Sequence, residues 1–312
     1  LCGARATGNA WPRWGVVGSV VSPLRPRMPL RTARRALVAP LLAPAALLAQ
    51  RAPRPVAAPA PDSATVARIV GAIPVRALGP AVMSGRITAL AVPRPFRSSY
   101  YVGTAGGGVW RTSNGGTTWR PIADSIGALS IGDLAVAPSD TAIVWIGTGE
   151  KNSLRSQAWG NGVHKSTDGG RTWKAMGLAD TKTIGRVLIH PTEPNTVYVG
   201  ALGHLWGPNR ERGVFKTTDG GATWTKVLFV DDTSGIVDMA FDPSNPDVVY
   251  AASWHRLRLG GSRMEGVGAG SALWRSADAG RTWTRLTDST RRNGLPCGDH
   301  GRIGIAAIAG NP

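Results

Sequence analysis

Charged side chains recur at one position of a repeated segment. Asp133, Arg186 and Asp238 each stand five residues before a proline. Because repeats place equivalent residues at equivalent points of a fold, we expect acidic and basic groups to alternate around one centre. Glycoside hydrolysis uses two carboxylates that flank the scissile bond, so Asp133 and Asp238 are candidate catalytic residues. The alternative is structural, a ring of ion pairs that closes a central channel.

Further candidates lie in irregular segments between predicted strands. Glu150 follows GTG at a strand end and is either a third catalytic carboxylate or an ion-pair partner of Arg155. Trp159 and Trp206 lie in irregular loops, where indoles stack on sugar rings or peptide side chains, or else fill the space between repeats. The candidate ligand-binding residues are Trp159, Trp206, Arg86, Arg155 and Arg186.

The sequence predicts neither a metal site nor a cofactor. Its five histidines show no metal-ligand spacing, and it contains no glycine-rich nucleotide loop and no GxSxG or HExxH segment. Asp-containing turns would offer calcium too few oxygen ligands. A sialidase would need an arginine cluster and a Tyr–Glu pair, and all four tyrosines lie on repeated predicted strands, as core residues would, so sialidase activity is not expected.

Repeated elements must position these candidates. Tryptophans recur 54, 51 and 59 residues apart, and each copy contains three short strands, a tight turn and a fourth strand. This arrangement is typical of propeller blades, so the predicted fold class is an all-β β-propeller with four-stranded blades. About four blades and the first strand of a fifth are expected, at approximately 85–124, 131–177, 183–229 and 235–288, with a stub at 301–312.

A turn of constant pattern precedes each fourth strand. Its copies are TSNGGTTW (112–119), STDGGRTW (166–173), TTDGGATW (217–224) and SADAGRTW (276–283). The Asp or Asn can accept hydrogen bonds from the turn's own N–H groups, the glycines adopt positive φ, and the tryptophan folds back as an apolar plug. The residues predicted to have this structural role are Asn114, Asp168, Asp219, Asp278, Trp119, Trp173, Trp224 and Trp283.

The turn pattern resembles the Asp-box, or bacterial neuraminidase repeat. The segments GTGEKNSLRSQAWGNGVHKSTDGG (147–170) and GALGHLWGPNRERGVFKTTDGG (200–221) narrow the resemblance to exported bacterial proteins related to the sortilin N-terminal propeller, often labelled glycosyl hydrolase. The resemblance covers about 76–312 and implies the fold rather than the reaction. Members are typically much longer, so it implies an N-terminal fragment that lacks C-terminal blades of the same polypeptide.

Two functions follow from this resemblance. We interpret the protein first as an exported propeller that binds a carbohydrate polymer or a protein or peptide ligand, sortilin-like, on the face opposite the Asp-boxes. The alternative is a glycoside hydrolase of the Asp-box propeller type that uses paired carboxylates. Distances between the carboxylates, and the exposure of the two tryptophans, distinguish these interpretations.

The charge of the chain is concentrated before the repeats. Its 312 residues carry a formal charge of +17, and residues 1–60 contain nine arginines and no acidic residue. These residues are interpreted as upstream sequence and a signal peptide that starts at Met28, followed by a linker at 61–78 and the propeller at 79–312. A secreted or periplasmic bacterial protein is expected, without a membrane span after leader cleavage and without a nucleic-acid partner.

Overall fold

The computed structural model describes residues 86–309, with gaps at 96–97, 153–156, 261–262, 289, 291–293 and 297, together with residues 62, 64, 68 and 72. The predicted leader, most of the predicted linker, and Arg155 lie outside the described residues. The chain divides into two units, and the description that follows concerns the unit that contains Leu78–Pro312.

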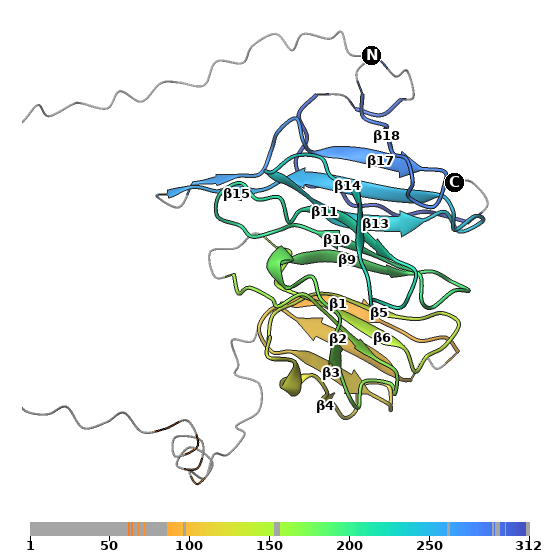
Figure 1. Ribbon diagram of the computed structural model, residues 1–312. Helices are drawn as coiled ribbons and strands as arrows, with labels where there is room; N and C mark the ends of the chain where they lie inside the picture. Colours follow the sequence, from red (N-terminus) through yellow and green to blue (C-terminus); the bar gives the residue numbers. More distant parts are fainter. Residues whose placement is uncertain are drawn as a thin grey trace, which may run out of the picture. The chain divides into compact units, whose positions relative to one another are not determined.

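Four antiparallel sheets of four strands follow one another along this unit (Figure 1). The first contains β1 (Ile87–Ala91), β2 (Tyr100–Thr104), β3 (Val109–Thr112) and β4 (Arg120–Pro121). The second contains β5 (Ile131–Val136), β6 (Val144–Thr148), β7 (Val163–Ser166) and β8 (Lys174–Ala175). The third contains β9 (Ile184–Ile189), β10 (Val197–Ala201), β11 (Gly213–Thr217) and β12 (Thr225–Leu228).

The fourth sheet has one addition. It contains β13 (Ser234–Phe241), β14 (Val249–His255), β17 (Ala272–Ser276) and β18 (Thr284–Arg285). A two-stranded hairpin of β15 (Leu257–Arg258) and β16 (Met264–Glu265) occupies the connection between β14 and β17. Short 3₁₀ turns at Asp124–Ile126 and Ala179–Thr181 lie between sheets. The predicted all-β propeller with four-stranded blades is confirmed.

Glycines allow the sheets to approach one another closely. The first strands β1, β5, β9 and β13 contact each other in that order. An isoleucine of one first strand lies against a glycine of the second strand in the preceding sheet, and a Cβ at Gly147 would lie only 2.4 Å from Ile184 Cγ2. The same contact occurs in the pairs Gly103–Ile131, Gly147–Ile184 and Gly200–Ile236. These positions therefore exclude side chains because of packing between blades.

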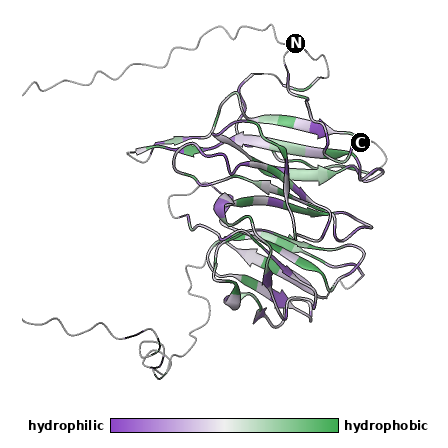
Figure 2. Ribbon diagram, in the orientation of Figure 1, coloured by the Kyte–Doolittle hydropathy of each residue, from purple (hydrophilic) through white to green (hydrophobic). Residues whose placement is uncertain are grey.

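The hydrophobic core is divided into clusters between consecutive sheets. Figure 2 shows hydrophobic stretches along the strand ribbons, as expected for strands buried by their neighbours. Trp173, Trp224 and Trp283 are partly buried and each packs against a different cluster. Trp119 is 38% exposed, and its ring meets that of Tyr100 edge-on at 5.3 Å. Three of the four repeated tryptophans thus lie where the core of one sheet meets the next, whereas Trp119 packs on its own sheet.

The repeated turns, called box turns below, are held by their third residue. Asp219 Oδ1 accepts the N–H of Thr223 at 3.0 Å, and Oδ2 accepts the Thr223 hydroxyl at 2.6 Å. These hydrogen bonds, led by those from Thr223, hold the pKa of Asp219 well below its usual range. In the first turn Asn114 Oδ1 likewise accepts the N–H of Thr118 at 2.9 Å, so an amide forms the same turn.

Cations connect neighbouring sheets through the box turns. Each comes from a third strand, lies over an aromatic ring of the second strand and donates to a box-turn carbonyl of the next sheet. The donors and acceptors are Arg111 to Gly169 at 3.0 Å, Lys165 to Gly220 at 3.3 Å and Lys216 to Ala279 at 2.8 Å. The rings are those of Tyr101, Trp145 and Tyr198. The cationic side chain at this position of β3, β7 and β11 therefore has a structural role, because it connects neighbouring sheets.

Residues 301–308 differ from the strand expected there. They form no regular strand, because their contacts to β13 are made through side chains rather than through a backbone ladder. The N–H of Ile305 donates to Asp238 Oδ2 at 3.0 Å, and Ile303 and Ile305 pack against a cluster that includes Val237 and Trp254. The segment nevertheless lies against the first strand of the fourth sheet.

Candidate functional site

A register shift places the charged residues of the first strands. The pairing of β5 with β6 shifts between Ile131 and Asp133, and equivalent shifts occur in the other three sheets. Asp133, Arg186 and Asp238 each follow such a shift, whereas Ala89 occupies the position in the first sheet. A register shift of this kind, or β-bulge, changes the direction of the next side chain. The shifts therefore place the three charged side chains near the strand ends at which the β6–β7, β10–β11 and β14–β17 connections begin.

One guanidinium lies between two carboxylates. Arg186 Nη1 is 3.8 Å from Asp133 Oδ1, and Arg186 Nε is 3.6 Å from Asp238 Oδ1. Lys151 Nζ is 3.4 Å from Asp133 Oδ1 and supplies a second cation. The structure therefore brings together the three alternating charges that the sequence singled out, and it adds Lys151.

The two aspartates differ in accessibility. Asp133 is 3% exposed, and its Oδ2 accepts the N–H of Val187 at 2.8 Å, so both of its oxygens face protein groups. The side chain of Asp238 is 25% exposed, although its Oδ2 also accepts a backbone N–H, that of Ile305. A carboxylate that acts on a substrate must reach it, and Asp238 meets this condition better than Asp133.

Glu150 forms an ion pair that the sequence did not predict. Its Oε1 accepts Arg86 Nε at 2.9 Å and Arg86 Nη2 at 2.5 Å, and the glutamate is 1% exposed. Arg155, the partner considered from the sequence, lies outside the described residues. Two N–H groups of Arg86 share one oxygen of Glu150, and the burial of this glutamate gives the pair more structural weight than a surface ion pair has.

Two fully buried arginines were missed by sequence reasoning. Arg212 donates from Nη1 to Leu202 O at 2.6 Å and from Nη2 to His204 O at 2.9 Å, which shapes the β10–β11 connection. Burial lowers the pKa of Arg212 to about 10. Arg256 has its pKa lowered to about 9, first by burial and then by neighbouring arginines, while Glu150 opposes the shift. The sequence signal that could have identified them is their position, because Arg212 directly precedes β11 and Arg256 directly follows β14.

Trp159 and Trp206 are exposed on the connections that leave this end of the sheets. Their exposed fractions are 55% and 48%, and Arg258 lies over the Trp206 ring at 5.6 Å from its centroid. Trp254 differs, because it is 6% exposed and donates from Nε1 to Gly266 O at 2.8 Å. We call the surface formed by the β6–β7, β10–β11 and β14–β17 connections the loop face.

A hollow of about 270 Å³ runs along the first strands of three sheets. Arg186 contributes to its lining, together with apolar residues such as Leu90 and Leu134. Among the described residues, no group of three or more His, Cys, Asp or Glu side chains is arranged to hold a metal ion. A helix with the length and apolar character of a membrane span is not found in the described part of the chain.

The chain is similar to proteins of known families. Residues 161–297 match the family model of Sortilin-Vps10, described as sortilin, neurotensin receptor 3. An ancestral GH74 enzyme of known structure has a TM-score of 0.50 at 21% identity, over 67% of this chain and 26% of that one. The comparisons accordingly support a β-propeller fold that is similar to those of sortilin and of a GH74 enzyme, in agreement with the sequence resemblance.

Particular relatives are xyloglucanases. A xyloglucanase of a Paenibacillus species is 24% identical over 224 residues, which cover 62% of this chain and 20% of the relative. A probable oligoxyloglucan-reducing end-specific xyloglucanase of Neosartorya fischeri is 30% identical over 128 residues, or 39% of this chain and 14% of that protein. The chain thus spans a fifth or less of the length of these relatives.

Proposed function

We propose that this chain is the carbohydrate-binding propeller of a glycoside hydrolase that acts on a neutral β-glucan such as xyloglucan. Similarity to xyloglucanases supports this class of ligand and favours the hydrolase, which the sequence offered as the alternative, over a sortilin-like binding protein. The loop face is proposed as the binding surface. Such polymers meet proteins outside the cell, which agrees with the proposed secreted or periplasmic location.

The observation that carries the proposal is the exposure of two indoles near the row of charges formed by Asp133, Arg186 and Asp238. Trp159 and Trp206 present flat apolar surfaces on which sugar rings stack. Asp133 pairs with Gly147, the residue before the last of β6, and Arg186 pairs with Gly200 at the same point of β10. The row of charges therefore adjoins the strand ends from which the tryptophan-bearing loops leave.

We assign different roles to the three candidate carboxylates. Asp238 is the proposed catalytic carboxylate of this chain, one of the two that glycoside hydrolysis requires, because its side chain is the most exposed of the three. Asp133 and Glu150 are proposed to position the loop face through their ion pairs with Arg186 and Arg86. Arg155, in the same connection as Trp159, remains a proposed ligand-binding residue.

Hydrolysis by the full chain and its variants tests these roles. Xyloglucan should release new reducing ends, and Asp238→Asn should lower kcat by more than about a hundredfold while KM stays within about threefold. Asp180→Asn, at a carboxylate whose side chain is 89% exposed, is the matched control and should retain full activity. Unchanged turnover in Asp238→Asn would remove this residue from the chemistry.

A second candidate function is recognition of a peptide by the loop face. The Sortilin-Vps10 match favours it, since the matched residues include Trp206 and both buried arginines. A peptide ligand and a neutral polysaccharide would compete for the same indoles. Binding of a panel of random peptides, with no binding of xyloglucan oligosaccharides, would select this second function.

A further inference from the structure

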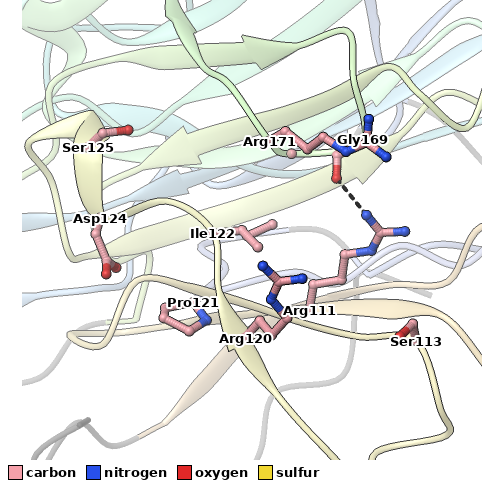
Figure 3. Close-up of a pocket in the computed structure, with 10 residues that line it drawn as sticks. Arg111, Ser113, Arg120, Pro121, Ile122, Asp124, Ser125, Gly169 and Arg171 are labelled. Carbon is pink, nitrogen blue, oxygen red and sulfur yellow. Dashed lines mark hydrogen bonds between the residues drawn. The ribbon is translucent and has the colours of Figure 1, made fainter.

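A cavity of about 630 Å³ lies between the first two sheets, beside their box turns. Figure 3 shows that Arg111 and Arg120 reach into it from the first sheet, and that Arg171 and Gly169 lie across from them. Ile122 lies between the two sides, and Asp124 is at one end. Its lining therefore combines three guanidinium groups with one carboxylate.

Two of these arginines face each other on neighbouring strands. Arg111 of β3 is the direct cross-strand partner of Arg120 of β4. Like charges in this position destabilise a sheet, and Arg171 adds a third positive charge from the next sheet. A bound anion would remove this repulsion, which makes an anionic ligand the simplest reason for the arrangement.

Equivalent positions in the four sheets show which of the three arginines have a structural role. Arg111 has a structural task, because Lys165 and Lys216 make the same contact to the next box turn. Arg120 and Arg171 have no such task. Their side chains are exposed, and among the described sheets no other neighbouring pair combines two arginines at these positions. The equivalent residues are Lys174, Thr225 and Thr284 in place of Arg120, and Thr117, Ala222 and Arg281 in place of Arg171.

The remaining lining groups indicate what the anion is part of. Guanidinium groups bind carboxylates and sulfates through paired hydrogen bonds. An ionised Asp124 only accepts hydrogen bonds, so it would repel a simple anion and would need hydroxyl donors. A ligand that carries both an acidic group and hydroxyl groups satisfies both sides. Its size range also fits, because pockets for small ligands span roughly 300–1,000 Å³.

We propose that this cavity binds the carboxylate- or sulfate-bearing unit of an acidic oligosaccharide. Arg120 and Arg171 bind the acidic group. Arg111, which is held in place by its hydrogen bond to Gly169 O, orients this group, and Asp124 accepts a hydrogen bond from a sugar hydroxyl. The site lies beside the box turns rather than on the loop face. It is therefore independent of the neutral polysaccharide site proposed above.

Calorimetry on the full chain tests the proposal with four ligands. These are a tetragalacturonate, a sulfated tetrasaccharide, a neutral xyloglucan oligosaccharide and inorganic sulfate. At least one acidic saccharide should bind with a Kd that weakens as salt is raised, and inorganic sulfate should bind at least tenfold more weakly. Failure of both acidic saccharides to bind, or equal binding of inorganic sulfate, overturns the proposal.

Matched variants locate the site. Arg171→Gln should weaken binding of the acidic saccharide about tenfold, which corresponds to the loss of one charge-assisted hydrogen bond. Arg281→Gln removes the same charge from the same position of another box turn and should leave the affinity unchanged. An equal effect of the two variants would mean that net charge, rather than this cavity, attracts the ligand. Neither variant should alter xyloglucan binding, which separates this outcome from failure of the loop-face proposal.

Discussion

Asp133 of the second sheet accepts a hydrogen bond of 2.8 Å from the backbone N–H of Val187 in the third. The same carboxylate pairs with Lys151 and Arg186, so one buried side chain joins a loop and two first strands. Asp238 repeats the arrangement toward Ile305. The charged residues of the first strands consequently also connect neighbouring blades.

Removal of the Asp133 carboxylate should destabilise the propeller. Asp133→Ala leaves the Val187 N–H and two cations without this partner, so we expect a loss of about 2–3 kcal/mol in the free energy of unfolding. Asp133→Asn keeps an acceptor for the N–H and should lose less. Urea unfolding of both variants measures the difference. A loss below about 0.5 kcal/mol in the free energy of unfolding of Asp133→Ala would contradict the proposal that this carboxylate stabilises the contact between the two sheets.

Ala279 should be replaceable by glycine with a gain in stability. Its φ is +57°, where a Cβ is strained, and the equivalent residues of the other box turns are glycines. Relief of this strain exceeds the entropic cost of glycine, so Ala279→Gly should stabilise by about 0.5–1 kcal/mol. Ala222→Gly, at a residue outside the left-handed region, should destabilise instead. Thermal unfolding that ranks the two variants in the opposite order would show that Ala279 is not strained.

Acid should weaken the box turns. Hydrogen bonds, led by those from Thr282, lower the pKa of Asp278 to about 2, and Asp168 and Asp219 are lowered by equivalent bonds. Because the folded-state pKa values lie below the unfolded value of about 3.9, this contribution is complete above about pH 5 and is lost progressively as the pH falls toward the folded-state values, at about 2 and below.

The triple variant Asp168→Asn, Asp219→Asn and Asp278→Asn tests this dependence. Its stability should change less between pH 4 and 2 than that of the parent, since Asn114 shows that an amide forms the same turn. Asp180→Asn, at a carboxylate outside the box turns, should keep the parent's slope. Parallel slopes for parent and triple variant would place the acid sensitivity elsewhere.

The sequence predicted the blades because their signals are local and repeated. Strand alternation and the Asp-Gly turn recur with each copy, and the proximity of Asp133, Arg186 and Asp238 followed from their equal spacing to a proline. The register shifts were not visible in this spacing, so Ala89 was not identified as the equivalent residue of the first sheet.

Contacts between sheets were harder to predict. The pair of Arg86 and Glu150 joins residues that are 64 positions apart, and no local pattern connects them. Arg212 and Arg256 are fully buried although arginine is usually exposed, so their residue type alone did not single them out. The hairpin of β15 and β16 has two-residue strands, too short to show alternation.

The central claim is that the loop face binds a neutral polysaccharide through its exposed indoles. The most direct measurement is the Kd of a xyloglucan oligosaccharide for the parent chain and for Trp159→Ala and Trp206→Ala, with Trp119→Ala as an exposed indole of the box turns. We predict a loss of about tenfold or more in each loop-face variant at unchanged thermal stability, and none in Trp119→Ala. Equal affinity of the parent and both loop-face variants would contradict the account.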